Sequence, residues 1–208
     1  MSWAILSTYL SEPDIDVVEH DAVELLEYAT THSIDSDAGF ALCLLGLSQA
    51  RRDDFEAGAR LVSKGLSTLT SARMEAFNIL VLAHICEAAL QAGRVDDAVA
   101  WMRRLTREDH NQDHWCSSEV FRVQGMLAQS QGEEGSAAEQ MLRGVALARR
   151  HGALSWELRS TVSLSRLWAQ QGRTEQALDA LLAAYGRYAE GFWSRDLIDA
   201  KTLIEQLR

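Results

Sequence analysis

Proline is nearly absent from this sequence of 208 residues, which contains only Pro13. Because a proline inside a helix removes a hydrogen bond and causes a clash, its scarcity permits long helices. Alternation of apolar and polar residues with a period of two, the pattern of half-buried strands, is also missing. Apolar residues instead return every three or four positions, as they do from Glu75 to Leu90. We therefore expect an all-α chain.

Cysteine is scarce and lacks the spacing of metal or redox motifs. The three cysteines, Cys43, Cys86 and Cys116, are an odd number, and none forms a CxxC pair. The chain has no recognisable signal peptide, and no apolar run reaches the roughly 18 residues that indicate a transmembrane helix. These absences favour a cytoplasmic protein in a reducing compartment, with no membrane contact.

Positive charge is in deficit, because 30 acidic residues face 20 basic ones and the formal net charge is -10. Such a chain repels nucleic acid and anionic membranes, so we expect proteins, peptides or small molecules as ligands. Residues 1–70 hold twelve acidic and four basic side chains. This excess is explained either by an ordinary solvated face or by a docking surface for a basic partner.

The signatures of common enzyme classes are also missing, among them GxxxxGK[ST], GxGxxG, GxSxG and HExxH. We therefore expect a protein that is not an enzyme and needs no cofactor. The one dense group of metal-ligand types contains His110, His114 and Cys116. Because this segment falls between two predicted helices and lacks ligands from a second element, we expect a polar connector instead, with Asp113 capping the next helix.

Short polar turns recur along the chain at residues 52–54, 92–94, 131–133 and 171–173. Small residues recur with them, seven positions before and five positions after the centre of each turn. A small side chain lets two helix backbones approach to about 8 Å, so each pair predicts the crossing point of a helical hairpin. The pairs are Gly46 with Gly58, Cys86 with Ala98, Gly125 with Ala137, and Ser165 with Ala177.

These turns divide the chain into about eleven helices in one domain, residues 1–208. Residues 1–32 form an incomplete first hairpin with helices at 2–10 and 14–32. Four hairpins fill residues 36–190, and a closing helix covers residues 194–207. The four hairpins are expected at 36–70, 72–108, 113–151 and 155–190. Further end signals are the N-cap candidates Ser155, Thr174 and Ser194 and the C-cap candidate Gly152.

The hairpin pattern resembles the tetratricopeptide repeat family. The clearest copy is Phe121-x-x-Gln124-Gly125-x-x-Ala128, followed by Gly132, Ala137 and Gly144, and a second copy contains Leu45-Gly46. The period of about 40 residues exceeds the usual 34 of that family, and its proline after the second helix is missing. The resemblance implies a right-handed superhelix of antiparallel hairpins, an α-solenoid.

A narrower resemblance comes from residues 152–159 (GALSWELR), 163–168 (SLSRLW), 171–173 (QGR) and 185–197. This part is similar to the C-terminal tetratricopeptide region of large bacterial signalling proteins. In those proteins a class III adenylate cyclase or a winged-helix activator domain precedes a STAND-type ATPase. The resemblance implies a regulatory or sensor arm, which is either a fragment of a longer protein or a short free-standing relative.

In such a superhelix the first helix of each hairpin lines a concave groove that suits an extended peptide or a partner helix. Arg122, Arg159 and Arg166 in this groove would suit an acidic or carboxylate-bearing ligand, or they pair with Glu119, Glu157 or other neighbours. The residues expected to face the groove are Cys43, Leu47, Ala83, Glu87, Glu119, Arg122, Met126, Arg159, Val162 and Arg166.

The function expected from these observations is a protein–protein interaction or scaffold module. Its partner would be a protein or peptide, including its own upstream ATPase, cyclase or DNA-binding domains. The alternative is a sensor that binds a small-molecule effector in the concave groove near Arg122 and Arg166. Self-association into a homo-oligomer is a further expectation, because the end of a truncated solenoid exposes apolar surface, here at the helix of Trp3.

Overall fold

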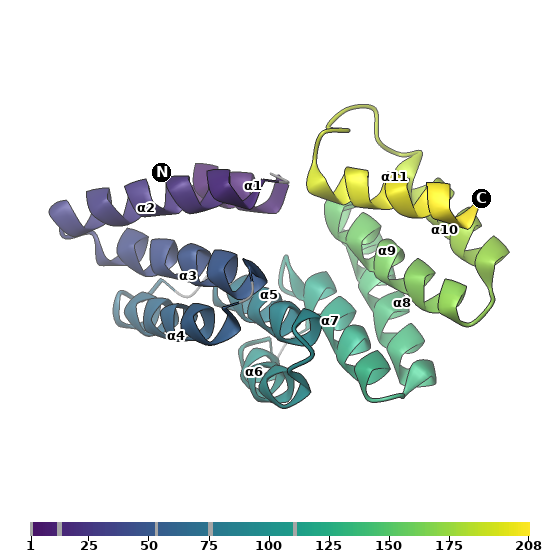
Figure 1. Cartoon of the computed structure of the whole chain (residues 1–208), viewed down its shortest axis with the longest axis horizontal. Helices are drawn as coiled ribbons and strands as arrows, with labels where there is room; N and C mark the ends of the chain where they lie inside the picture. Colours follow the sequence, from purple (N-terminus) through teal and green to yellow (C-terminus); the bar gives the residue numbers. More distant parts are fainter. Residues whose placement is uncertain (1, 12–13, 53, 75–76, 110–111) are drawn as a thin grey trace. The chain divides into compact units, whose positions relative to one another are not determined.

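The computed structural model describes residues 2–11, 14–52, 54–74, 77–109 and 112–208. These residues form eleven helices and no strand, so the prediction of an all-α chain of about eleven helices is confirmed for the described residues. The helices are α1 (Ser2–Ser11), α2 (Ile15–Thr31), α3 (Asp35–Arg52), α4 (Phe55–Ser71), α5 (Asn78–Gln91), α6 (Val95–Glu108), α7 (Ser117–Ser130), α8 (Glu134–His151), α9 (Leu154–Gln170), α10 (Thr174–Tyr185) and α11 (Arg195–Leu207) (Figure 1).

The chain divides into two compact units, Met1–Trp101 (unit 1) and Met102–Arg208 (unit 2). The division falls inside α6, which is one continuous helix. Each unit is described separately below. The prediction of a single domain over residues 1–208 stays a prediction.

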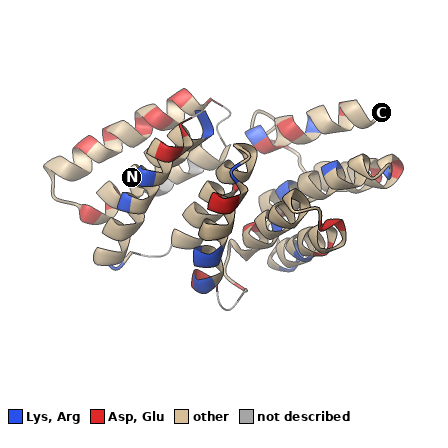
Figure 2. Cartoon of the chain, turned by 60° about the horizontal axis from the view of Figure 1, so that its bottom comes forward, with Lys and Arg blue, Asp and Glu red and all other residues tan. Residues whose placement is uncertain are grey.

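Unit 1 packs its helices largely in the order of the sequence. α1 contacts α2 and α3, α2 lies against α3, and α3 and α4 each contact α5. The hydroxyl of Tyr9 lies 2.8 Å from Nδ1 of His84, and both side chains are buried. This hydrogen bond ties α1 to α5. α2 carries five carboxylates and no Lys or Arg, and its acidic segments are red in Figure 2.

The small-residue pairs mark a close backbone contact in each of the four hairpins. A Cβ at Gly46 would lie 2.6 Å from the carbonyl oxygen of Gly58, and a Cβ at Gly125 would lie 2.8 Å from that of Ala137. In the other two hairpins the small side chain itself donates to that carbonyl. Cys86 Sγ lies 3.3 Å from the oxygen of Ala98, and Ser165 Oγ lies 3.0 Å from the oxygen of Ala177. The predicted crossing points are therefore confirmed.

Unit 2 contains a row of three helices, α7, α9 and α11, that run in the same direction. From α7 to α9, hydrogen bonds join Arg122 to Ser163 at 3.5 Å and Gln129 to Gln170 at 2.7 Å. From α9 to α11, Arg159 pairs with Asp196 at 3.2 Å and Arg166 with Asp199 at 3.5 Å. The residue numbers rise together on both sides of each pair, so the helices are parallel. α8 and α10 each contact α9.

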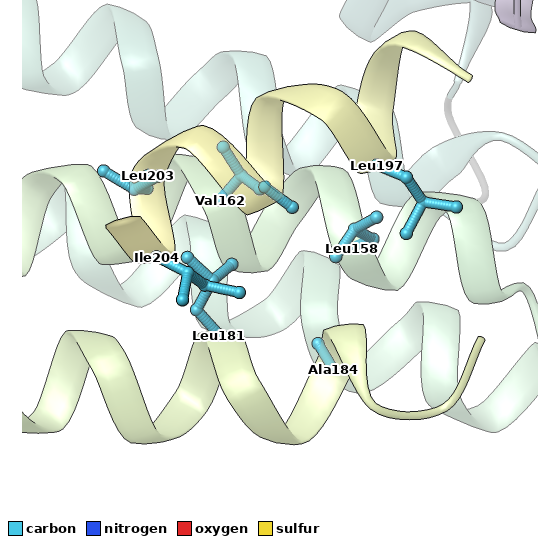
Figure 3. Close-up of a cluster of buried hydrophobic side chains, with 8 residues drawn as sticks. Leu158, Val162, Leu181, Ala184, Leu197, Leu203 and Ile204 are labelled. Carbon is cyan, nitrogen blue, oxygen red and sulfur yellow. The ribbon is translucent and has the colours of Figure 1, made fainter. Parts of the chain in front are cut away.

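α11 closes unit 2 through an apolar cluster that it shares with α9 and α10. Figure 3 shows its side chains pointing toward those of the two neighbouring helices. The cluster buries residues that lack any polar group in their side chains, so its stability comes from removing apolar surface from water. Its members are Leu158, Val162, Leu181, Ala184, Leu197, Ala200, Leu203 and Ile204.

Two helix ends agree with the expected ones, and three others differ. Gly152 is in the left-handed conformation at the end of α8, as predicted, and Ser194 is the N-cap position of α11. The N-cap assignments of Ser155 and Thr174 were wrong, because α9 begins at Leu154 and Thr174 is already the first residue of α10. α10 ends at Tyr185 rather than near residue 190, since Gly186 follows it and the chain turns again at Gly191 with a positive φ.

Candidate functional site

The carboxylate of Glu119 is the centre of a buried ion network in unit 2. It accepts a hydrogen bond from Nε of Arg122 at 2.7 Å and a second one from Nε of Arg159. Glu119, Arg122 and Arg159 expose only 1%, 3% and 7% of their surface. Because buried charges cost several kcal/mol unless they are paired, each member of this network depends on the others.

The network extends from α7 through α9 to α11. Arg159 also pairs with Asp196 at 3.2 Å, and an Nη of Arg122 lies 3.0 Å from the sulfur of Met126. Arg122 therefore pairs with one carboxylate, Glu119, and Arg159 pairs with both Glu119 and Asp196. Three helices that are far apart in the sequence are thereby joined by one set of charged hydrogen bonds.

A second buried carboxylate, Glu157, lies near the start of α9. Its oxygens accept from Arg149 at 2.8 Å and from Arg187, and both arginines are largely exposed. This carboxylate is 2% exposed, whereas its cationic partners remain in contact with water. Glu157 therefore fixes the end of α8 and the segment after α10 onto α9.

The expected groove residues of unit 1 are mainly packed inside it. Cys43, Leu47 and Ala83 are buried, and Glu87 is half-buried. Cys43 faces α4, since its sulfur lies 4.0 Å from the carbonyl oxygen of Val62. Within this unit, only Glu87 of the four is open to solvent to an appreciable degree.

The remaining expected groove residues of unit 2 differ in exposure. Val162 belongs to the apolar cluster beneath α11, Met126 is half-buried beside Arg122, and Arg166 is exposed with its pair to Asp199. The structure thus brings Glu119, Arg122, Arg159 and Met126 together, but as interacting neighbours. Arg122 and Arg159 thus make the internal ion pairs that were one of the two expectations for these arginines. A carboxylate ligand, the other expectation, would have to displace Glu119 or Asp196 from them.

Sequence reasoning missed Asp196 and Arg187 as members of these networks. Asp196 lies in the predicted closing helix and Arg187 in the fourth predicted hairpin, and neither was expected to take part in an ion network. The signal that could have revealed Asp196 is its distance of 37 positions from Arg159, which is close to the repeat period. Glu157 was named only as one possible partner of an arginine, and nothing in its local sequence indicated burial.

The metal-ligand candidates lie in the connector before α7. His110 is outside the described residues, while Nδ1 of His114 lies 3.2 Å from Sγ of Cys116. Burial, with Asp109 and Glu119 nearby, raises the pKa of the Cys116 thiol far above its usual range, and burial lowers the pKa of His114. Both shifts favour the neutral groups. In the described part of the chain, no group of three His, Cys, Asp or Glu side chains is placed to hold a metal ion.

Asp113 does not cap the helix that follows it, so that expectation was wrong. α7 begins only at Ser117, and Asp113 instead accepts hydrogen bonds from Arg150 at 2.5 Å and His151 at 2.9 Å, both on α8. The hydrogen bond from Arg150, and to a smaller extent that from His151, holds the pKa of the Asp113 carboxyl below its ordinary value. The connector is therefore attached to the end of α8.

No helix among the described residues is long and apolar enough to cross a membrane. All three cysteines are buried and form no disulfide. A scan against protein-family models finds no family that matches this chain, and a search of curated proteins also finds no match.

Proposed function

We propose that this protein is a non-enzymatic protein–protein interaction module built as an α-solenoid of the tetratricopeptide type. In this proposal the hairpins form a right-handed superhelix, and one face of it holds a peptide or a helix of a partner protein. The chain would work in the cytoplasm as the regulatory or sensor arm of a larger bacterial signalling protein. Three buried thiols without disulfides are in keeping with a reducing compartment.

The observation that carries this proposal is the recurrence of one hairpin crossing at a constant spacing. The small residues Gly46, Cys86, Gly125 and Ser165 each contact the residue twelve positions later. Structural repeats that stack in this way bury their cores against their neighbours and leave extended faces for binding. Grooves on such faces suit extended peptides and partner helices.

Within unit 2 the proposed binding face is the outer side of the row α7, α9 and α11. Arg166 and Gln170 on α9 are exposed there, with Met126 and Ser163 half-buried beside them. These side chains offer a cation, an amide, a hydroxyl and a thioether along parallel helices. An extended peptide with an acidic residue near Arg166 fits this set, since the pair of Arg166 with Asp199 is exposed and weak.

Affinity capture with the full chain tests this proposal. The binding-face variant R166E/Q170A changes two exposed residues that are four positions apart on α9. The matched control R60E/K64A changes two exposed residues with the same spacing on α4. Captured proteins are identified by mass spectrometry, then purified and titrated against each variant by calorimetry.

We expect a purified partner whose affinity falls at least about tenfold with R166E/Q170A and stays unchanged with R60E/K64A. Helix content from circular dichroism should be the same for all three chains. A partner that binds both variants equally well would place the binding face elsewhere. If no purified protein binds the chain directly, the proposal is wrong.

A further inference from the structure

Unit 2 contains a hollow that lies apart from the ion network and from the proposed binding face. Its volume is about 400 Å³. This is within the range of about 300 to 1,000 Å³ that small-molecule sites occupy. The connector before α7, one residue of α7 and four residues of α8 line it, namely Gln112, Phe121, Arg143, Ala146, Leu147 and Arg150.

Arg143 gives this hollow a cation for which the described part of the chain supplies no acidic partner. Its guanidinium lies 4.3 Å from the centroid of the Phe121 ring and donates to the amide oxygens of Gln112, at 3.0 Å, and Gln140, at 3.2 Å. Within the described ranges of the chain, no carboxylate lies in ion-pair distance of Arg143. Neutral amide oxygens are weaker hydrogen-bond acceptors for a guanidinium than a carboxylate is. An incoming anion can therefore replace these amides and form stronger hydrogen bonds with Arg143.

The remaining lining combines a second cation with apolar surface. Arg150 lies two helical turns after Arg143 and is already paired with Asp113 at 2.5 Å. Ala146 and Leu147 lie between the two arginines on α8 and add aliphatic carbon. Two guanidinium groups, of which Arg150 is paired with Asp113, thus lie beside apolar side chains in this hollow.

We propose that this hollow binds a small organic carboxylate. The carboxylate group pairs with Arg143 in place of the amide of Gln112, and the apolar body of the ligand lies along Ala146 and Leu147. The size of the hollow favours a small molecule over a protein segment. This site is distinct from the proposed interaction face. Its lining comes from α8, the connector before α7 and Phe121 of α7, and it includes none of the side chains named on that face, Met126, Ser163, Arg166 and Gln170.

Isothermal titration calorimetry of the full chain with naphthalene-2-carboxylate tests this inference. Two further probes separate its parts: naphthalene-2-carboxamide keeps the apolar body without the charge, and acetate keeps the charge without the body. R143Q removes the pairing cation and leaves an exposed position. A146W fills the hollow without removing a charge, and R60Q on α4 is the control for loss of one exposed arginine.

We expect saturable binding of naphthalene-2-carboxylate, at least about tenfold tighter than binding of the carboxamide or of acetate. R143Q should reduce the affinity for the carboxylate to that for the carboxamide, A146W should abolish both, and R60Q should change neither. The inference is overturned if the carboxylate shows no saturation up to about 10 mM, if the carboxamide binds as well, or if R143Q binds like the parent chain. None of these results depends on the partner captured through Arg166.

Discussion

Small residues decide how closely the helices of a hairpin approach, and Gly46 is the clearest case. A Cβ there would lie 2.6 Å from the oxygen of Gly58 and 2.7 Å from the nitrogen of Val62, which are both backbone atoms. Backbone cannot rotate away as a flexible side chain can. Gly135 on α8 is the opposite case, since a Cβ there would meet nothing within 4 Å.

We expect Gly46→Ala to lower the free energy of unfolding by about 1 to 3 kcal/mol, because the added methyl forces the helices apart. Gly135→Ala should raise it by no more than about 0.5 kcal/mol, since alanine favours the helix but Gly135 lies in the first turn of α8. Urea denaturation followed by circular dichroism measures both. A Gly46→Ala chain as stable as the parent would mean that the crossing is looser than described.

The buried charges of Arg122 and Arg159 likewise depend on a neighbouring residue, the carboxylate of Glu119. Glu119→Gln keeps the size of the side chain but leaves Arg122 and Arg159 buried with one carboxylate fewer. We expect a loss of about 3 to 5 kcal/mol in the free energy of unfolding. Glu56→Gln, which removes an exposed partner of Arg94, should cost less than about 1 kcal/mol. Equal effects of the two variants in urea denaturation would contradict the burial of the network.

At the scale of the element, α11 is held by its apolar face as well as by ion pairs. Leu197 is 3% exposed within the cluster of Figure 3, while the neighbouring Ile198 is 43% exposed. Leu197→Ala should destabilise unit 2 by about 2 to 5 kcal/mol. Ile198→Ala should change stability by no more than about 0.5 kcal/mol. Hydrogen exchange of the α11 amides provides the local readout, and equal protection in both variants would count against this packing.

The connector before α7 should respond to pH through Asp113. Its pKa is lower in the folded chain than its ordinary value of 3.8, because Arg150 and His151 donate to the carboxylate. The Asp113 carboxylate therefore contributes its full stabilisation above about pH 4, and this contribution is lost as the pH falls through the lowered pKa. Carbon NMR of the Asp113 carboxyl measures the titration, and Asp113→Asn removes it. A midpoint at or above 3.8 would disagree with these contacts.

The elements that local sequence determines were predictable, and those set by tertiary approach were not. Gly93, Gly132 and Gly172 lie in the predicted turns with positive φ, where glycine is favoured, and the small-residue pairs follow from spacing alone. In contrast, α5 begins at Asn78 rather than near residue 72, since Arg73 adopts a positive φ after the end of α4.

Only part of the membership of the candidate site was predictable. Repeat spacing placed Arg122, and helical spacing placed Glu119 and Arg159, on one face, and the three do lie together. That their charges are satisfied internally depends on how deeply α9 packs against α7 and on the position of Asp196 on α11. No local pattern encodes those distances, so the sequence alone left pairing and ligand binding as open alternatives.

At the scale of the whole molecule, the same hairpin recurs in both compact units. Hydrogen bonds between successive hairpins, and from the last hairpin to α11, join residues 37 to 41 positions apart, as in Arg94 with Glu56, Gln129 with Gln170 and Arg159 with Asp196. This regularity is what the proposed interaction module rests on. A protein with one hairpin of this kind and three unrelated ones would give no reason to expect a repeated binding face.

The measurement that tests this account most directly is the stability of four variants that each place leucine at one predicted crossing. Urea denaturation is compared with four controls that place leucine at an exposed position of a helix in the same hairpin. The crossing variants are Gly46→Leu, Cys86→Leu, Gly125→Leu and Ser165→Leu. The controls are Arg60→Leu, Ala100→Leu, Glu139→Leu and Asp179→Leu.

Each crossing brings a small residue against the backbone of the second helix. The free energy of unfolding of all four crossing variants should therefore fall by about 1 to 3 kcal/mol. The controls should stay within about 0.5 kcal/mol of the parent chain. If two or more crossing variants are as stable as their controls, the hairpins are not equivalent, and the repeat on which the proposed function depends does not exist.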